Sequence, residues 1–171
     1  MVDDGDAARV SLRGFDELEI YVDLWRCIFC HACEVACERV HGSSRITVEA
    51  VKDWASVPVS CHHCEAAPCA LVCPSGALTQ EEAEVAFEAG KCTRCGLCII
   101  ACPFGAVDLD PAAMVQKCDL CPEREVPPCI LTCPTEALVF GDRFEATEEL
   151  RKRAASRIAQ SYAASVGRER A

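Results

Sequence analysis

The sequence has few aromatic residues, no long hydrophobic run and no excess of positive charge. Phe, Trp and Tyr make up 6% of its 171 residues, so the bulky side chains that fill an ordinary core are scarce. The longest apolar patches, such as residues 97–101, are interrupted by cysteines and charges and are too short to span a membrane. The formal net charge of -10 argues against nucleic acid as a partner, because a phosphate-binding face needs a basic patch.

The first residues lack the pattern of an export signal. Residues 1–13 contain Asp3, Asp4 and Asp6 without an apolar run, and no twin-arginine pair opens the chain. We therefore expect a soluble protein in the reducing cytoplasm, with no direct insertion into a membrane. The length suits one compact domain, or two small lobes sharing a core, but leaves no room for a catalytic domain as well.

Cysteine is the residue that the sequence has in excess, with 16 copies arranged as four quartets and none left over. The first and third quartets are spaced C-x2-C-x2-C-x3-C. The second is spaced C-x2-C-x4-C-x3-C and the fourth C-x2-C-x7-C-x3-C. In chain order the quartets are Cys27, Cys30, Cys33 and Cys37; Cys61, Cys64, Cys69 and Cys73; Cys92, Cys95, Cys98 and Cys102; and Cys118, Cys121, Cys129 and Cys133.

Such quartets are typical of ligands to [4Fe-4S] clusters. A cubane needs four thiolates, and two-residue gaps let one loop supply three of them while the fourth comes from elsewhere. Disulfides are disfavoured because a reducing compartment is expected and because crowded quartets offer many alternative pairings. Structural zinc is the remaining alternative, although zinc sites normally take two separated cysteine pairs rather than four cysteines in one short run.

A repeated five-residue motif predicts short strands. After the last cysteine of three quartets, proline is followed three residues later by Ala-Leu or Ala-Val, at residues 74–78, 103–107 and 134–138. Proline ends the preceding helical turn and the apolar pair starts an extended segment. Residues 85–88 and 139–140 are the expected partner strands.

Two further segments and the C-terminal tail carry periodic patterns. Residues 18–24 and 46–50 alternate in hydrophobicity and are expected to pair with each other as a hairpin-like pair beside the first quartet. Thr147 is the expected N-cap of a C-terminal helix that runs to about Val166. Its apolar stripe consists of Leu150, Ala154, Ile158, Tyr162 and Val166. The stripe either packs on its own domain or docks a partner or a second copy, in the latter case forming filaments by head-to-tail contact.

Other side chains lie at the quartets but are not needed as ligands. Four are cations: Arg26, Lys91, Arg94 and Lys117. They either offset thiolate charge and raise the cluster potentials or are solvated on the surface. Three are histidines that we expect beside the ligands or on the surface: His31, His62 and His63. Three are aromatic residues that we expect to pack around the clusters: Tyr21, Trp25 and Trp54.

The amino-acid sequence of the four quartets resembles that of a known family. The runs are CIFCHACEVACERVH, CHHCEAAPCALVCPSGAL, KCTRCGLCIIACPFGAV and KCDLCPEREVPPCILTCPTEAL. They resemble the four-cluster polyferredoxin subunits of the dimethyl sulfoxide reductase iron–sulfur type, over about residues 18–140. The likeness is greatest to the short cytoplasmic branch that serves formate dehydrogenase and hydrogenlyase, carbon monoxide dehydrogenase and tungsten aldehyde oxidoreductase.

The resemblance implies an electron-transfer subunit that is not an enzyme on its own. It implies four [4Fe-4S] clusters that relay single electrons between the active site of a large catalytic partner and another redox subunit or carrier. The expected partner is a molybdenum or tungsten pterin enzyme acting on an aldehyde or formate, or a hydrogenase, with a flavin subunit or a second copy of the chain as further partners. The alternative is a free soluble polyferredoxin, which would purify without a stoichiometric partner.

The resemblance also implies how the ligands are shared between quartets. The implied sets are Cys27, Cys30, Cys33 and Cys133; Cys118, Cys121, Cys129 and Cys37; Cys61, Cys64, Cys69 and Cys102; and Cys92, Cys95, Cys98 and Cys73. Quartets 27–37 and 118–133 then form one lobe, and quartets 61–73 and 92–102 form the other.

We therefore expect an α+β fold with two ferredoxin-like lobes, each binding two [4Fe-4S] clusters, with short antiparallel strands and a C-terminal helix. The expected divisions are a flexible acidic N-terminus at residues 1–14, a tandem ferredoxin-like iron–sulfur domain at 15–142 and the C-terminal helix at 143–171.

Overall fold

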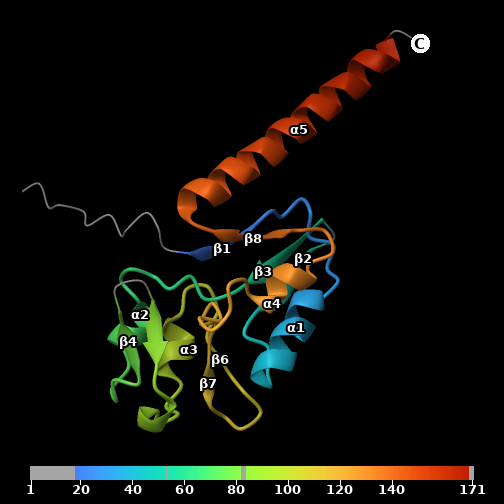
Figure 1. Ribbon diagram of the computed structural model, residues 1–171. Coiled ribbons are helices and arrows are strands. Elements are labelled where there is room, and N and C mark those ends of the chain that lie inside the picture. The colour runs from blue at the N-terminus through green and yellow to red at the C-terminus, as the bar shows by residue number, and fades with distance from the viewer. Residues whose placement is uncertain (1–17, 53, 82–83, 170–171) are drawn as a thin grey trace, which may run out of the picture.

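The computed structural model describes residues 18–52, 54–81 and 84–169, with the side chains of 166–169 not described. The acidic N-terminus expected at residues 1–14 lies outside this part of the chain. Within it, short helices alternate with two-stranded antiparallel sheets and are followed by one long helix (Figure 1). The expected α+β class, with short antiparallel strands and a C-terminal helix, is confirmed.

The helices are α1 (Ala32–His41), α2 (Pro68–Leu71), α3 (Leu97–Ala101), α4 (Pro128–Thr132) and α5 (Arg143–Glu169), with a single 3-10 turn at Ala89–Lys91. The strand pairs are β1 (Glu19–Val22) with β8 (Leu138–Gly141), β2 (Thr47–Val51) with β3 (Ala55–Val59), β4 (Leu78–Gln80) with β5 (Val85–Phe87), and β6 (Asp108–Leu109) with β7 (Val115–Gln116). Proline begins both α2 and α4, where its missing N–H has no helical partner to lose.

The strand predictions are partly confirmed. The segment after the second quartet forms β4 and pairs with β5, with Leu78 opposite Phe87. The expected pairing of residues 18–24 with 46–50 is wrong. β1 pairs with β8, the strand after the fourth quartet, and β2 turns back directly onto β3. A local hairpin closes a short loop at little entropic cost, which leaves β1 available for the distant strand.

Cysteines supply a large part of the core. One buried group comprises Cys33, Cys37, Ile46, Val48, Cys129 and Leu138. The other comprises Ala67, Cys69, Leu78, Val85, Cys98, Val107 and Val115. Helix α1 packs on α4 beside the first group, and α2 packs on α3 beside the second (Figure 1). The first quartet is thereby brought to the fourth, and the second to the third.

Helix α5 begins earlier than the sequence suggests. Asp142 is the cap, because its Oδ1 accepts the amide N–H groups of Phe144 and Glu145 at 2.7 and 2.9 Å. The expected N-cap at Thr147 is therefore wrong. The first part of the helix packs on the body, against β8, and its C-terminal part extends away from it (Figure 1).

The expected apolar stripe of α5 is accordingly divided. Leu150 and Ala154 are half-buried at the base, whereas Ile158 and Tyr162 are 69% and 71% exposed. Among the described residues, no helix has the length and apolar character needed to cross a membrane.

Candidate metal centres

The loops that carry the first two cysteines of each quartet share one unusual backbone conformation. The residue before the second cysteine has a positive φ in every quartet: Phe29 at 57°, His63 at 44°, Arg94 at 58° and Leu120 at 59°. This left-handed backbone conformation is less favourable for an L-amino acid by roughly 1–2 kcal/mol per residue. This conformation turns successive N–H groups toward one point, as in an anion-binding nest. The amides of His63 and Leu120 accordingly donate to the sulfurs of Cys61 and Cys118, both at 3.4 Å.

Two cavities are each lined by four cysteines from two different quartets. One is lined by Cys27, Cys30, Cys33 and Cys133. The other is lined by Cys73, Cys92, Cys95 and Cys98. In each case three cysteines come from one loop and the fourth from the partner quartet. None of the sixteen cysteines forms a disulfide.

The remaining cysteines also gather across quartets. Burial, followed by the neighbouring charges of Cys118, Cys37 and Cys121 in that order, raises the pKa of the Cys129 thiol to about 12. In the other half of the molecule, burial raises the pKa of the Cys69 thiol, as do the charges of Cys61 and Cys102.

Such thiols fit a metal site because they ionise with difficulty by themselves. Burial raises the pKa of Cys118 to about 12 and that of Cys33 to about 11. Four neighbouring buried thiolates would repel one another strongly in a low dielectric. Only strong positive charge at their centre makes the ionised set stable, and iron supplies it.

The last cysteine of three quartets receives a hydrogen bond from a backbone amide. The recipients are Cys37, Cys102 and Cys133, and the donors are the amides of Arg45, Ala106 and Ala137 at 3.2, 3.4 and 3.2 Å. Although burial opposes it, the amides of Leu138 and Ala137 and the Thr135 hydroxyl lower the pKa of Cys133. Amide donors to sulfur stabilise negative charge on the ligand and so raise the potential of an attached cluster.

Lys117 is a buried cation between two groups of cysteines. Its side chain is 5% exposed and its ammonium donates to the carbonyl of Cys118 at 3.0 Å. Burial raises the pKa of the Cys61 thiol and the Lys117 charge partly offsets that rise. Within the described residues no carboxylate pairs with Lys117, and a buried ammonium needs an anion nearby. Thiolate ligands would provide that anion.

The other expected cations are paired or exposed at the surface. Arg26 lies 3.3 Å from the carboxylate of Glu136, and exposed Lys91 forms an ion pair with Glu88. Arg94 is exposed. Of the four cations, Lys117 is the one whose burial places its charge among the thiols.

The histidines and tryptophans near the quartets differ in burial and in their contacts. His63 is 2% exposed and its Nδ1 accepts the amide N–H of Val85 at 3.1 Å, so it fixes the second quartet against β5. His31 Nδ1 lies 2.8 Å from the carboxylate of Glu34. Trp25 and Trp54 are 84% and 76% exposed, so the expectation that both pack around the clusters is wrong.

Three polar residues near Cys121 were missed from the sequence. His41 Nε2 lies 3.3 Å from Cys121 Sγ, and Arg45 forms an ion pair with Asp119 beside it. Burial and the charge of Arg45 lower the pKa of His41, so the imidazole is neutral and can donate from Nε2 to sulfur. His41 and Cys121 are 80 positions apart in the chain, and no local spacing signals their contact.

Comparison with known proteins decides the family. The sequence matches the 4Fe-4S dicluster domain over residues 52–143, a span that contains the second, third and fourth quartets. The chain belongs to the 4Fe-4S dicluster domain family. The predicted iron–sulfur character is thereby confirmed.

Several relatives are covered by this chain over most of their own length. An iron-sulfur protein of Rhodospirillum rubrum is 31% identical over 84% of this chain and 92% of its own. Formate hydrogenlyase subunit 2 of Escherichia coli K12 is 34% identical over 72% of this chain and 81% of its own. The thiosulfate reductase electron transfer subunit PhsB of Salmonella typhi is 38% identical over 68% and 71%, respectively. Two other relatives are much longer, and this chain spans 20% of each.

Proposed function

We propose that this dicluster-domain protein is an electron-transfer subunit that holds four [4Fe-4S] clusters. It relays single electrons between the active site of a partner oxidoreductase and another redox subunit or carrier. When bound, each cluster accepts and releases one electron at a time. The observation that carries the proposal is the grouping of cysteines from different quartets. Two cavities are each lined by four of them, Cys129 lies within electrostatic reach of Cys118, Cys37 and Cys121, and Cys69 lies within reach of Cys61 and Cys102.

The proposed ligand sets follow these groups. Cys27, Cys30, Cys33 and Cys133 hold what we term the end cluster. Cys118, Cys121, Cys129 and Cys37 hold the next, followed by Cys61, Cys64, Cys69 and Cys102, and finally Cys92, Cys95, Cys98 and Cys73. Two observations support this order. The charge of Cys33 contributes to the raised pKa of Cys129, and that of Cys61 contributes to the raised pKa of Cys118, so neighbouring groups lie within electrostatic reach.

The fold is proposed as two ferredoxin-like lobes within residues 15–142, followed by the helical segment at 143–171. One lobe combines the first and fourth quartets and the other combines the second and third. The two separate buried groups, and the packing of α1 on α4 and of α2 on α3, support this division.

The proposed partner is a large catalytic oxidoreductase subunit in the cytoplasm. Electron-transfer and hydrogenlyase subunits among the relatives support a role inside a complex rather than as a free carrier. A molybdenum or tungsten pterin enzyme acting on formate or an aldehyde, or a hydrogenase, is the proposed class. A flavin subunit, or a second copy bound through the exposed part of α5, is a further proposed partner.

The test is anaerobic purification of the native protein under mild conditions, followed by identification of co-purifying subunits and their molybdenum and tungsten content. A stoichiometric large subunit, whose substrate reduces the clusters of this chain, is the expected result. Recovery of the iron-loaded chain without any partner would instead show a free polyferredoxin.

A further inference from the structure

The turn that follows the last cysteine of a quartet occurs three times, and one copy is strained. The third residue after the cysteine has a left-handed backbone in each: Gly76 with φ 66°, Gly105 with φ 64° and Glu136 with φ 52°. Glycine adopts this conformation freely, whereas the Cβ atom of glutamate makes it unfavourable. Such strain persists only where the surrounding structure holds the backbone in place.

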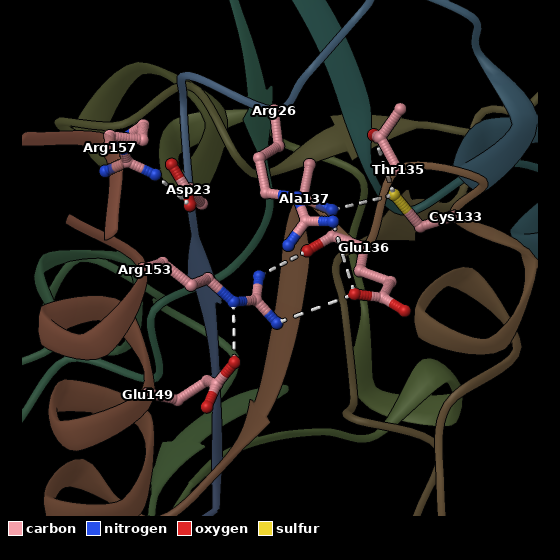
Figure 2. Close-up of polar contacts among 9 residues, drawn as sticks. All are labelled: Asp23, Arg26, Cys133, Thr135, Glu136, Ala137, Glu149, Arg153 and Arg157. Atoms are coloured by element: carbon pink, nitrogen blue, oxygen red, sulfur yellow. Dashed lines mark hydrogen bonds and ion pairs between the residues drawn. The ribbon is translucent and has the colours of Figure 1, made fainter. Parts of the chain in front are cut away.

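Glu136 connects the turn to two arginines. Its carboxylate lies 3.3 Å from Arg26 and 4.0 Å from Arg153, and its carbonyl accepts a hydrogen bond from Arg153 Nη1 at 2.6 Å. Figure 2 shows Arg153 reaching from α5 to both the carbonyl and the carboxylate of this residue. Helix α5 is therefore attached to the turn that carries Cys133.

Arg153 is itself held in place. Its side chain is 15% exposed, and its Nε donates to Glu149 at 2.7 Å, one turn earlier on the same helix. One turn later, Arg157 binds the carboxylate of Asp23 at 2.9 Å, and that carboxylate is 2% exposed. The Arg157 side chain is 37% exposed, so the carboxylate is the shielded member of this pair.

Both arginines act on the same short segment. The amide of Asp23 donates to the carbonyl of Ala137 at 2.7 Å, so Arg157 holds Ala137 indirectly, through Asp23. Arg153 holds the preceding residue, Glu136, directly through its carbonyl. The amide of Ala137 in turn donates to Cys133 Sγ at 3.2 Å (Figure 2). From the guanidinium of Arg153 to the ligand sulfur, the path runs through a single peptide unit.

We propose that Arg153 is a positioning residue for the end cluster, holding the Glu136–Ala137 peptide so that its N–H points at Cys133 and adding a positive charge beside it. This inference rests on the proposed function, because it assigns Cys133 to that cluster. Arg153 touches neither the ligand sulfur nor the metal. It acts on the potential through the peptide that it fixes and through its charge.

The test compares Arg153→Met with Arg153→Lys and with Arg151→Met, an exposed arginine on the same helix. The potential of each cluster is measured by anaerobic redox titration followed by electron paramagnetic resonance, with the Cys133→Ser variant assigning the end-cluster signal. In Arg153→Met the reduced-to-oxidised ratio of the end cluster at a fixed ambient potential falls at least threefold. The other three clusters do not shift, Arg153→Lys recovers most of the loss, and Arg151→Met leaves the ratio unchanged.

Glu136→Gly gives a second, independent reading. Glycine accepts the left-handed backbone and keeps the carbonyl that Arg153 binds, so the peptide stays in place. The end-cluster potential therefore does not fall, in contrast to Arg153→Met. An equal fall in Glu136→Gly, or an equal shift of all clusters in Arg153→Met, would show a general loosening of the protein and overturn the proposal.

The proposed function and the positioning role of Arg153 can be disproved separately. If the unaltered chain contains neither the iron nor the sulfide of four clusters, the proposed function fails before any variant is compared. If all clusters are present and the end-cluster potential is the same with and without Arg153, only the positioning role is wrong.

Discussion

At the scale of single residues, the ammonium group of Lys117 lies among cysteine thiols. Burial makes these thiols difficult to ionise. The raised pKa values of Cys118 and Cys129 show how strongly their surroundings disfavour negative charge. Lys117 is buried beside them and lowers the electrostatic penalty at Cys61, across the boundary between two proposed clusters. Its charge favours whichever oxidation state is more negative, which is the reduced one.

Lys117→Met should therefore lower the potentials of the two clusters proposed on either side of it. The expected change is on the order of tenfold in the reduced-to-oxidised ratio at a fixed potential, which is about 59 mV for a one-electron couple. Redox titration of the purified chain measures it, and Lys117→Arg should retain most of the wild-type value.

Lys91→Met is the matched control, because Lys91 occupies the same place before the third quartet but is exposed and paired with Glu88. Its removal should shift no potential by more than a small fraction of the Lys117 effect, since water screens an exposed charge. Equal shifts in the two variants would mean that burial of Lys117 has no influence on the clusters.

Residues of this kind mark the limit of prediction from the sequence. The sixteen cysteines could be predicted to be ligands because their spacing is local and repeated. Lys91 and Lys117 could not be distinguished, because both precede a first cysteine and only the tertiary structure buries one of them. The contact of His41 with Cys121 depends on the packing of α1 near the fourth quartet, which no spacing reveals.

At the scale of helices and strands, the structure differs from the sequence-based expectation in the N-cap of α5 and in the partner of β1. Thr147 and Asp142 are both good N-cap residues, and the choice between them depends on where β8 ends and the chain turns. Asp142 directly follows Gly141, the last residue of β8, so the earlier start lets α5 pack against that strand from its first turn. The pairing of β1 with β8 could not be predicted from a local sequence pattern either, because it joins segments at the two ends of the domain.

Asp142→Ala should destabilise the base of α5 by about 0.5–2 kcal/mol, the usual effect of losing an N-cap side chain. Hydrogen exchange of the amides at residues 144–150 measures this local loss directly. Thr147→Ala should have almost no effect at the same amides, because Thr147 lies inside the helix. If Thr147→Ala were the more damaging change, the assignment of Asp142 as the cap would be wrong.

At the scale of the whole molecule, thiols occupy the place that large apolar side chains take in other proteins. Both buried groups contain cysteines, and the sheets among the described residues have two strands each, too few for independent stability. Metal binding to such residues contributes directly to folding, as in other small metalloproteins. The fold class and the family followed from the cysteine pattern, whereas the catalytic partner depends on surfaces that the pattern does not encode.

The central claim is that this chain holds four [4Fe-4S] clusters, each shared between two quartets. The most direct test is the iron and acid-labile sulfide content of the chain isolated without oxygen, expressed per polypeptide. Four cubanes require about sixteen irons and about sixteen sulfides. About eight of each would contradict the account, because it would leave half of the cysteines without a cluster.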